Sequence, residues 1–297
     1  MSFVLERMTE QTFPECVGFL RREERRCVTL SSHFASDGKP RYNAEAIADA
    51  FLVFAGEGGR DVTGVIARTA TGIVLHCLDL GAAPPADSLK AAVRRVIGQQ
   101  TVRCVLGSAA ETRFLEDAIS RRPYRSVDYT LMLSWPAEGT APSPPPAVAA
   151  PCADGRAMTF VRCVPADAEA LLSLQEGYER EEVVPPGDPF DRKACGIVLA
   201  RSLERQAIYA ARIGGAFVAK AGTNARGLEW DQLGGVYTDP EWRGRGIARA
   251  LISHVVKERR AAGRKIALFV KNGNETARKV YEDTGFLPDS PFRISYF

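Results

Sequence analysis

The stretch VYTDPEWRGRGIAR, residues 236–249, carries the most information in this chain. An apolar strand-like run passes through a turn containing Gly244 and Gly246 into a helical pattern that begins at Ile247. Glycine allows positive φ and has no side chain, so several N–H groups of such a turn face one concavity at the positive end of the helix dipole. This geometry suits a pyrophosphate. The pattern is neither a Walker loop nor a Rossmann fingerprint, and a tight turn with solvated arginines is the competing interpretation.

A second segment, NETARKVYEDTGF at residues 274–286, follows a buried strand predicted over 265–270. Asn274 is the predicted N-cap of a helix over 275–284 that ends at Gly285. Tyr281 lies about two helical turns after Asn274, so we expect both side chains on one side of the helix, beside the glycine turn. Taken singly, a plain N-cap and a core aromatic are the simpler interpretations of the two residues.

Together, RxxGxA at residues 243–248 and NxxAxxxYxxxGF at 274–286 resemble the GCN5-related N-acetyltransferase (GNAT) family. The resemblance covers residues 157–297. The predicted fold class is α/β (α+β): two tandem GNAT-like domains, each with a mixed, mostly antiparallel central sheet flanked by helices. In the second half, we predict helices over 167–182 and 189–204, strands over 207–212, 216–221 and 228–238, a helix over 247–262, the strand and helix already given, and a last strand over 293–297.

The resemblance implies an N-acetyltransferase that moves an acetyl group from acetyl-CoA to a primary amine by direct attack in a ternary complex. The strand that ends at residue 238 would splay from the one over 265–270, and pantetheine would pair with its backbone. Tyr281 would be the general acid that protonates the departing thiolate, and an N–H near Val236 or Tyr237 would stabilise the oxyanion. The implied acetyl-CoA-binding residues are Val236, Tyr237, Thr238, Arg243, Gly244, Arg245, Gly246, Ile247, Ala248, Arg249 and Asn274.

The general base is where the chain departs from the family pattern. Many members carry a glutamate where this chain has Gln232, and others carry one where it has Phe269. Glu229 and Asp231 are close by, but strand alternation puts them on the opposite face from Gln232 unless a bulge intervenes. The remaining alternatives are a water relay, an amine that arrives neutral, or a helix glutamate such as Glu181 or Glu182.

Charge is unevenly distributed along the second half. Lys and Arg outnumber Asp and Glu by 11 to 2 over residues 243–279, which suits the phosphates of CoA. Residues 165–191 contain eight acidic residues and one basic residue, Arg180. This acidic run is either a solvated helix face or an acceptor pocket that favours cationic amines.

Residues 136–156 form a predicted proline-rich linker between two domains, 1–135 and 157–297. The first half repeats the element order, with strands over 51–55, 62–68 and 72–80, a helix over 87–97, a strand over 102–106, a helix over 111–120 and strands within 124–135. Its turn at 81–87 contains Pro84, Pro85 and Asp87, which remove N–H donors and add a repelling charge. We therefore expect a degenerate GNAT-like domain without cofactor binding.

The composition narrows the classes of protein and of binding site that the chain can belong to. The sequence has a net charge of +3 and no apolar run long enough to span a membrane, and its residues 1–13 contain charges but no hydrophobic signal core. We therefore expect a cytoplasmic protein that binds neither nucleic acid nor membrane. Seven cysteines form no CxxC pair and three histidines have no partner at ligand spacing, so we expect no metal. Two alternatives stay open: another acyl or aminoacyl transferase of this fold (mycothiol synthase-like), and a non-catalytic acyl-CoA-binding module. The sequence leaves the oligomeric state and the acceptor's identity open.

Overall fold

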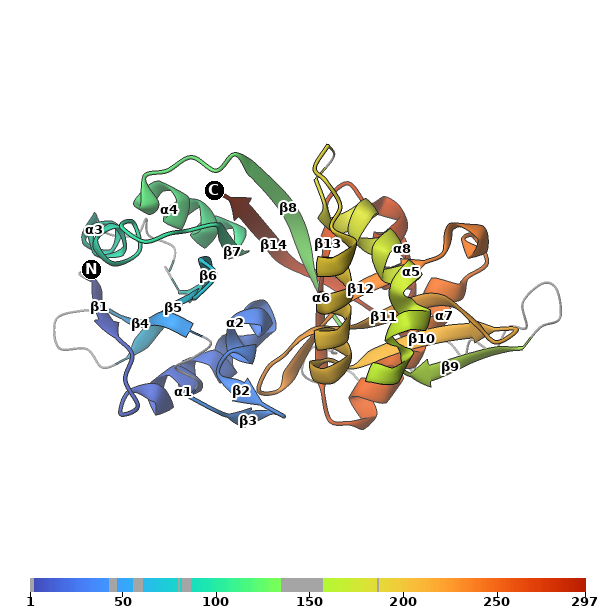
Figure 1. Ribbon diagram of the computed structural model, residues 1–297. Helices are drawn as coiled ribbons and strands as arrows, with labels where there is room; N and C mark the ends of the chain where they lie inside the picture. The colour runs from blue at the N-terminus through green and yellow to red at the C-terminus, as the bar shows by residue number, and fades with distance from the viewer. Residues whose placement is uncertain are drawn as a thin grey trace.

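A computed structural model describes residues 3–42, 47–55, 61–79, 81, 87–134, 157–185 and 187–297 (Figure 1). The predicted linker over 136–156 and the prolines Pro84 and Pro85 lie outside these residues. The first half contains β1 (Phe3–Arg7), α1 (Phe13–Glu23), η1 (Glu24–Arg26), α2 (Val28–Ser32), β2 (Ala35–Ser36), β3 (Lys39–Pro40), β4 (Ile47–Ala55), β5 (Val62–Thr69), β6 (Ile73–Leu78), α3 (Asp87–Val96), β7 (Cys104–Ser108), α4 (Ala109–Ile119) and β8 (Arg125–Leu133).

The second half contains the helices and strands predicted for it, with shifts of a few residues at their ends. Its elements are β9 (Met158–Arg162), η2 (Pro165–Asp167), α5 (Ala168–Tyr178), the π-helical turn η3 (Glu179–Val183), α6 (Arg192–Arg205), β10 (Ile208–Ile213), β11 (Ala216–Arg226), β12 (Trp230–Thr238), η4 (Pro240–Trp242), α7 (Ile247–Ala261), β13 (Lys265–Lys271), α8 (Glu275–Asp283) and β14 (Leu287–Tyr296). No element is predicted before residue 51, where the structure has β1, α1, η1, α2, β2, β3 and the start of β4.

One continuous sheet runs through both halves. Its twelve described strands lie in the order β1-β4-β5-β6-β7-β14-β8-β13-β12-β11-β10-β9. Among these strands, β6 with β7 and β12 with β13 pair in parallel, and the other pairs are antiparallel. The predicted fold class, a mixed and mostly antiparallel sheet flanked by helices, is therefore confirmed.

The two halves exchange strands at the middle of this sheet. β14, the last described strand, lies between β7 and β8 of the first half. β8 in turn separates β14 from β13, pairing with β13 from Ala267 opposite Leu133 to Lys271 opposite Tyr129. Figure 1 shows the result: the C-terminus lies beside α4, and β8 runs across to the second half. Each half therefore completes its sheet with a strand from the other.

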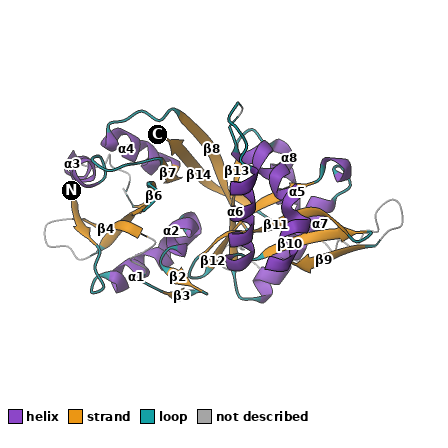
Figure 2. Cartoon of the chain, viewed as in Figure 1, coloured by secondary structure: helices purple, strands orange, loops and turns teal. Residues whose placement is uncertain are grey.

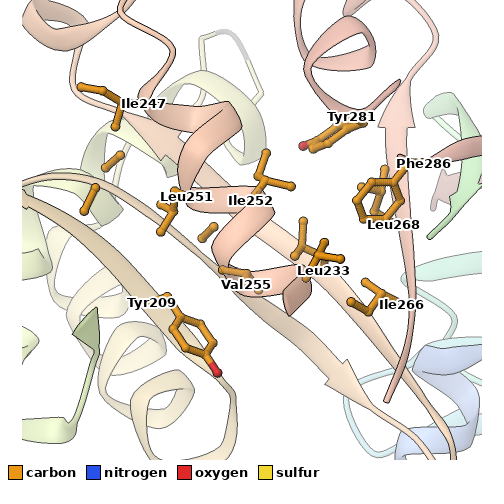
Figure 3. Close-up of a cluster of buried hydrophobic side chains, with 14 of the residues drawn as sticks. Tyr209, Leu233, Ile247, Leu251, Ile252, Val255, Ile266, Leu268, Tyr281 and Phe286 are labelled. Carbon is orange, nitrogen blue, oxygen red and sulfur yellow. The ribbon is translucent and has the colours of Figure 1, made fainter. Parts of the chain in front are cut away.

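Helices cover both faces of the sheet in the second half (Figure 2). α7 begins at Ile247, and the predicted repeat of Ile247, Leu251 and Val255 is buried against Leu233, Ile266 and Leu268 (Figure 3). Gly263, with φ of +74°, ends this helix as predicted. α5 and α6 pack on the opposite face, where Leu171, Leu174, Leu199 and Leu203 surround Tyr237. The sheet thus separates an α7 face from an α5 face.

A buried carboxylate joins the first half to the β11–β12 turn. Glu24 is fully buried and accepts hydrogen bonds from the backbone N–H groups of Leu228 and Glu229 and from the Ser31 hydroxyl. Burial raises the pKa of Glu24, while these hydrogen bonds and the charge of Arg264 oppose the increase. Because the turn's N–H groups are satisfied by a residue about two hundred positions away, the halves pack as one unit.

Candidate active site

A V-shaped opening lies between β12 and β13. The two strands are paired only over residues 230–233 of β12 and 265–268 of β13. Beyond Leu233, β13 continues alongside β8, and β12 stays with β11. On its β13 side, the backbone of residues 234–238 therefore has no neighbour among the described strands. An unpaired strand edge of this kind can pair with an extended ligand chain, and the pairing of pantetheine with it stays a prediction.

A β-bulge shapes the open part of β12. Gly222 of β11 pairs with Gly234 and Lys220 pairs with Tyr237, so Gly235 and Val236 together oppose one residue. Gly235 has φ of +60°, which a glycine adopts at little cost. The extra residue reverses the strand alternation. For this reason Leu233 faces α7 while Tyr237, four residues later, faces α5.

The glycine turn stands at the N-terminus of α7. Gly244 and Gly246 have φ of +75° and +74° and are exposed; a Cβ at Gly244 would point into open space, and one at Gly246 would lie 3.9 Å from the Arg249 guanidinium. The first N–H groups of α7, from Ile247 onward, have no acceptor within the helix. This geometry fits a pyrophosphate. The Arg245 guanidinium lies 4.8 Å from the Trp242 ring centre beside the turn.

Arg243 is directed away from this turn. Its guanidinium donates two hydrogen bonds of 2.9 Å to the Glu181 carboxylate and one of 3.0 Å to the Thr238 carbonyl. The Tyr237 hydroxyl donates to the same carboxylate at 2.8 Å. Arg243 thus connects the end of β12 to η3 on the α5 face. Its predicted role toward acetyl-CoA stays a prediction.

Tyr281 packs in the core that also contains Leu233 and Leu268, from the paired parts of β12 and β13. It is 9% exposed, belongs to the core formed around α7, and its ring makes an edge contact with Phe286 at 5.9 Å. Figure 3 shows its hydroxyl oxygen directed away from Phe286. Burial, followed by the proximity of Tyr178 and Glu182, raises the pKa of the hydroxyl well above its ordinary value. The phenol is therefore protonated at neutral pH, as a general acid must be.

Asn274 caps α8, with its side-chain oxygen accepting from the Ala277 N–H at 3.0 Å. It also lines an open cleft of about 760 Å³. The other lining residues come from η3, from the β13–α8 segment and, unexpectedly, from the first half's β8: Ser126, Val127, Asp128, Glu181, Glu182, Lys271, Asn272, Gly273, Glu275 and Thr276. Through Glu181 and Lys271, this cleft borders the ends of β12 and β13. The β8 residues are not predicted for this site, because no local pattern in the sequence places them there.

The helix glutamates that could act as a base are already engaged. Burial opposes ionisation of Glu181, but hydrogen bonds from Arg243 and Tyr237 outweigh it and lower its pKa. Glu182 forms an ion pair of 2.8 Å with Lys271. Removing a proton from an amine would require either carboxylate to give up its partner. A base is therefore not assigned to either residue.

The residues in and beside the strands that were considered for the general base also have partners within the protein. Gln232 and Asp231 point to opposite faces, as strand alternation predicts: the Gln232 side-chain oxygen accepts from Thr29 of α2 at 2.6 Å, and fully buried Asp231 pairs with Arg259 and Arg264. Glu229 forms a half-exposed ion pair with Lys265. The Phe269 ring stacks on Phe292 at 3.8 Å. Asp231 is thus a structural anion.

Asp231→Asn should lower the free energy of unfolding by about 3 kcal/mol, because two partly buried guanidinium groups lose their counter-charge. Glu229→Gln is the matched control and should cost less than about 1 kcal/mol, since its ion pair is exposed to solvent. Urea unfolding of both variants measures the difference. An Asp231→Asn protein as stable as the wild type would contradict the structural role.

The corresponding opening of the first half is filled by its own side chains. β6 and β7 pair in parallel only over residues 73–75 and 104–106. Beyond that point, Arg26 donates to the Leu78 carbonyl at 3.0 Å and to Glu111 at 2.8 Å. The buried His76 ring packs so closely on β7 that a Cβ at Gly107 would lie 2.3 Å from it. A backbone edge that a ligand could use is thus taken by an arginine.

Metal-binding groups and membrane-spanning helices were considered as well. The described residues contain no group of three or more His, Cys, Asp or Glu side chains arranged to hold a metal ion. None of the described helices has the length and apolar character needed to cross a bilayer.

Comparison with known proteins matches part of the second half to a family. Residues 169–286 match the model of the acetyltransferase (GNAT) family, so this part of the chain is a GNAT domain. Members of the family transfer acyl groups and use acetyl-CoA. No curated protein sequence matches the chain.

Solved structures share the fold of the whole chain. A tandem GNAT protein from the clavulanic acid biosynthesis pathway has 13% identity over 99% of this chain and 98% of its own, with a TM-score of 0.56. A GCN5-related N-acetyltransferase from Sphaerobacter thermophilus has 18% identity over 98% and 94%, with a TM-score of 0.54. A GNAT-family acetyltransferase from Colwellia psychrerythraea has 13% identity over 99% of both chains, with a TM-score of 0.51. The resemblance to the GNAT fold, in a tandem arrangement, is therefore confirmed.

Proposed function

We propose that this protein is an N-acetyltransferase that moves the acetyl group of acetyl-CoA directly to a primary amine in a ternary complex. The observation that carries the proposal is the V between β12 and β13, with the glycine turn of α7 following β12 and the buried Tyr281 in the core that also contains Leu233 and Leu268. The glycine turn suits the pyrophosphate of an acyl-CoA, the unpaired strand edge suits its pantetheine, and the protonated tyrosine suits its thioester sulfur.

The binding residues follow from this alignment. The N–H groups of residues 244–249, together with the side chains of Arg245 and Arg249, would hold the pyrophosphate and the charged end of CoA. The edge of residues 236–238 would pair with pantetheine, and Asn274 would contact it from α8. Arg243 would act indirectly, because its contacts fix the strand end next to the turn.

The chemistry requires one bond to form and one to break. The neutral amine nitrogen attacks the carbonyl carbon, and the N–H of Val236 or Tyr237 stabilises the negative oxygen. As the C–S bond breaks, Tyr281 donates its proton to the thiolate sulfur. The nitrogen releases a proton to water, and solvent returns one to Tyr281. With the glutamates of η3 engaged in ion pairs, water or an amine that arrives neutral supplies the base function.

The acceptor would enter through the cleft beside η3. Four carboxylates and one lysine line it, but Glu181, Glu182 and Asp128 are paired with Arg243, Lys271 and Arg293. Glu275 therefore supplies the excess negative charge. An exposed charge of this kind is worth less than about 1 kcal/mol, so we expect cationic amines to be preferred over neutral ones by less than about fivefold.

We further propose that residues 1–135 form a degenerate GNAT-like domain, that 136–156 are a linker and that 157–297 form the acetyl-CoA-binding domain. The filled opening between β6 and β7 supports the loss of cofactor binding in the first half. The first half would instead serve the acceptor site, to which it contributes residues 126–128 of β8.

A direct assay tests the activity. The protein is incubated with acetyl-CoA and a panel of primary amines that includes diamines, amino sugars and peptide N-termini, and products are detected by mass spectrometry. Acetylated amine supports the proposal. Acetyl-CoA binding without any product would favour the non-catalytic alternative, which is motivated by the amide of Gln232 at a position where many family members carry a glutamate. Turnover with other acyl-CoA donors only would favour the transfer of a different acyl group.

Tyr281→Phe keeps the ring in the core and removes only the hydroxyl, so acetyl-CoA affinity should survive while kcat falls by about 10²-fold or more. Steady-state kinetics with the best acceptor of the panel gives kcat, and calorimetry gives the affinity. Tyr209→Phe is the control, because Tyr209 is also buried but lies on β10. A loss of only a few-fold, with chemistry shown to limit the rate, would remove Tyr281 from its role.

A further inference from the structure

A buried lysine stands behind the β12 bulge. Lys220 of β11 is 4% exposed, and its ammonium donates to the Gly235 carbonyl at 2.9 Å. The same nitrogen lies 4.7 Å from the centre of the Tyr178 ring. A buried ammonium is costly unless it is well paired, and an apolar side chain could fill the same volume. The lysine therefore needs a reason beyond packing.

Lys220 and Tyr178 both interact with the backbone of Gly235. The Tyr178 hydroxyl interacts with the backbone of this residue, which is at the centre of the bulge and whose carbonyl accepts from Lys220. The carbonyl of Gly235 belongs to the same peptide plane as the N–H of Val236. Because a peptide is planar, fixing that carbonyl also fixes the direction of the following N–H.

We propose that Lys220 is a positioning residue for acyl transfer: by holding the Gly235 carbonyl, it aims the Val236 N–H at the thioester oxygen in the V. This inference rests on the proposed function, because it concerns the oxyanion contact of that site. Lys220 itself touches neither acetyl-CoA nor the acceptor. Its effect passes through the Gly235–Val236 peptide.

The surroundings of Lys220 make this contact sensitive to pH. Burial lowers the pKa of Lys220 to about 8, against the opposing charge of Glu179. The other titratable groups that face it are the Cys195 thiol on α6, the Cys163 thiol after β9 and the Tyr178 hydroxyl on α5, and burial raises the pKa of each to about 12. As the pH rises through about 8, Lys220 therefore loses its proton first, and a charge-assisted hydrogen bond becomes a weaker neutral one.

The test uses full-length protein with acetyl-CoA labelled with ¹³C at the carbonyl. Hydrogen bonding to the carbonyl oxygen moves its ¹³C resonance downfield and lowers its stretching frequency. In Lys220→Met we expect acetyl-CoA affinity within about threefold of the wild type, but loss of at least about half of the bound carbonyl shift. Lys220→Arg should restore part of the shift. Lys257→Met, on the exposed side of α7, is the control and should leave it unchanged.

A pH titration of the wild type gives a second readout that needs no substitution. The bound carbonyl shift should decrease with a midpoint near pH 8 and should be independent of pH in Lys220→Met. An unchanged shift in Lys220→Met, or a wild-type shift that is constant through this range, would overturn the positioning role while leaving the acetyltransferase proposal intact. Failure of the wild type to bind acetyl-CoA would overturn both.

Discussion

Gly246→Glu is expected to weaken acetyl-CoA binding by at least about 10²-fold, because a carboxylate placed at the N-terminus of α7 opposes the pyrophosphate at close range. Titration calorimetry measures the affinity. For the wild type the same experiment should give one acetyl-CoA per chain, since the opening in the first half is filled by Arg26 and His76. A second bound molecule would contradict the degenerate role of that half.

Gly263→Glu provides the matched control for this substitution. Gly263 has the same φ of +74°, is also exposed, and stands at the other end of the same helix. Both substitutions therefore carry the same backbone strain of about 1–2 kcal/mol and the same added charge. Only the one at residue 246 should affect binding. Equal affinities in the two variants would show that the glycine turn does not hold the phosphates.

Cutting the chain within residues 136–156 should leave the two fragments associated, whereas neither fragment should fold when produced alone. The reason is the exchange of strands: the second fragment needs β8 between β13 and β14, and the first needs β14 between β7 and β8. Without these partners, central strands become edges, and the buried side chains Leu131 and Met132 lose their packing. Size-exclusion chromatography follows association, and thermal unfolding of each fragment tests its cooperativity.

The outcome separates two views of the architecture. Co-expressed fragments that elute together and unfold at the temperature of the intact chain would support interleaved halves. A fragment of residues 157–297 that unfolds cooperatively as a monomer by itself would contradict this view. The linker can be cut without affecting the described sheet, because both of its flanking strands, β8 and β9, keep all their pairings on either side.

The sequence was sufficient for features whose residues are close together in the chain. The glycine turn before Ile247, the Asn274 cap and the period of α7 depend on windows of a few residues, and the structure has each of them. The two motifs were therefore enough to indicate the GNAT domain. The acceptor and the general base could not be read in this way, since they depend on which side chains meet across elements.

Only the tertiary structure shows which side chains from different elements come into contact. Nothing local predicts that Glu24 satisfies the β11–β12 turn, that Thr29 holds Gln232, or that Asp231 is enclosed by two arginines. The bulge at Gly235 and the lysine behind it follow from the pairing of β11 with β12, which one strand does not encode by itself.

The contrast has a single physical origin. Helix periods, caps and glycine turns arise from interactions between near neighbours in the chain, so a short stretch such as residues 236–249 determines them alone. The exchange of β8 and β14 and the ion pairs that occupy Glu181 and Glu182 arise from contacts between distant residues. Their partners are selected only when the whole sheet is assembled, because burial and register across strands determine which groups remain free for chemistry.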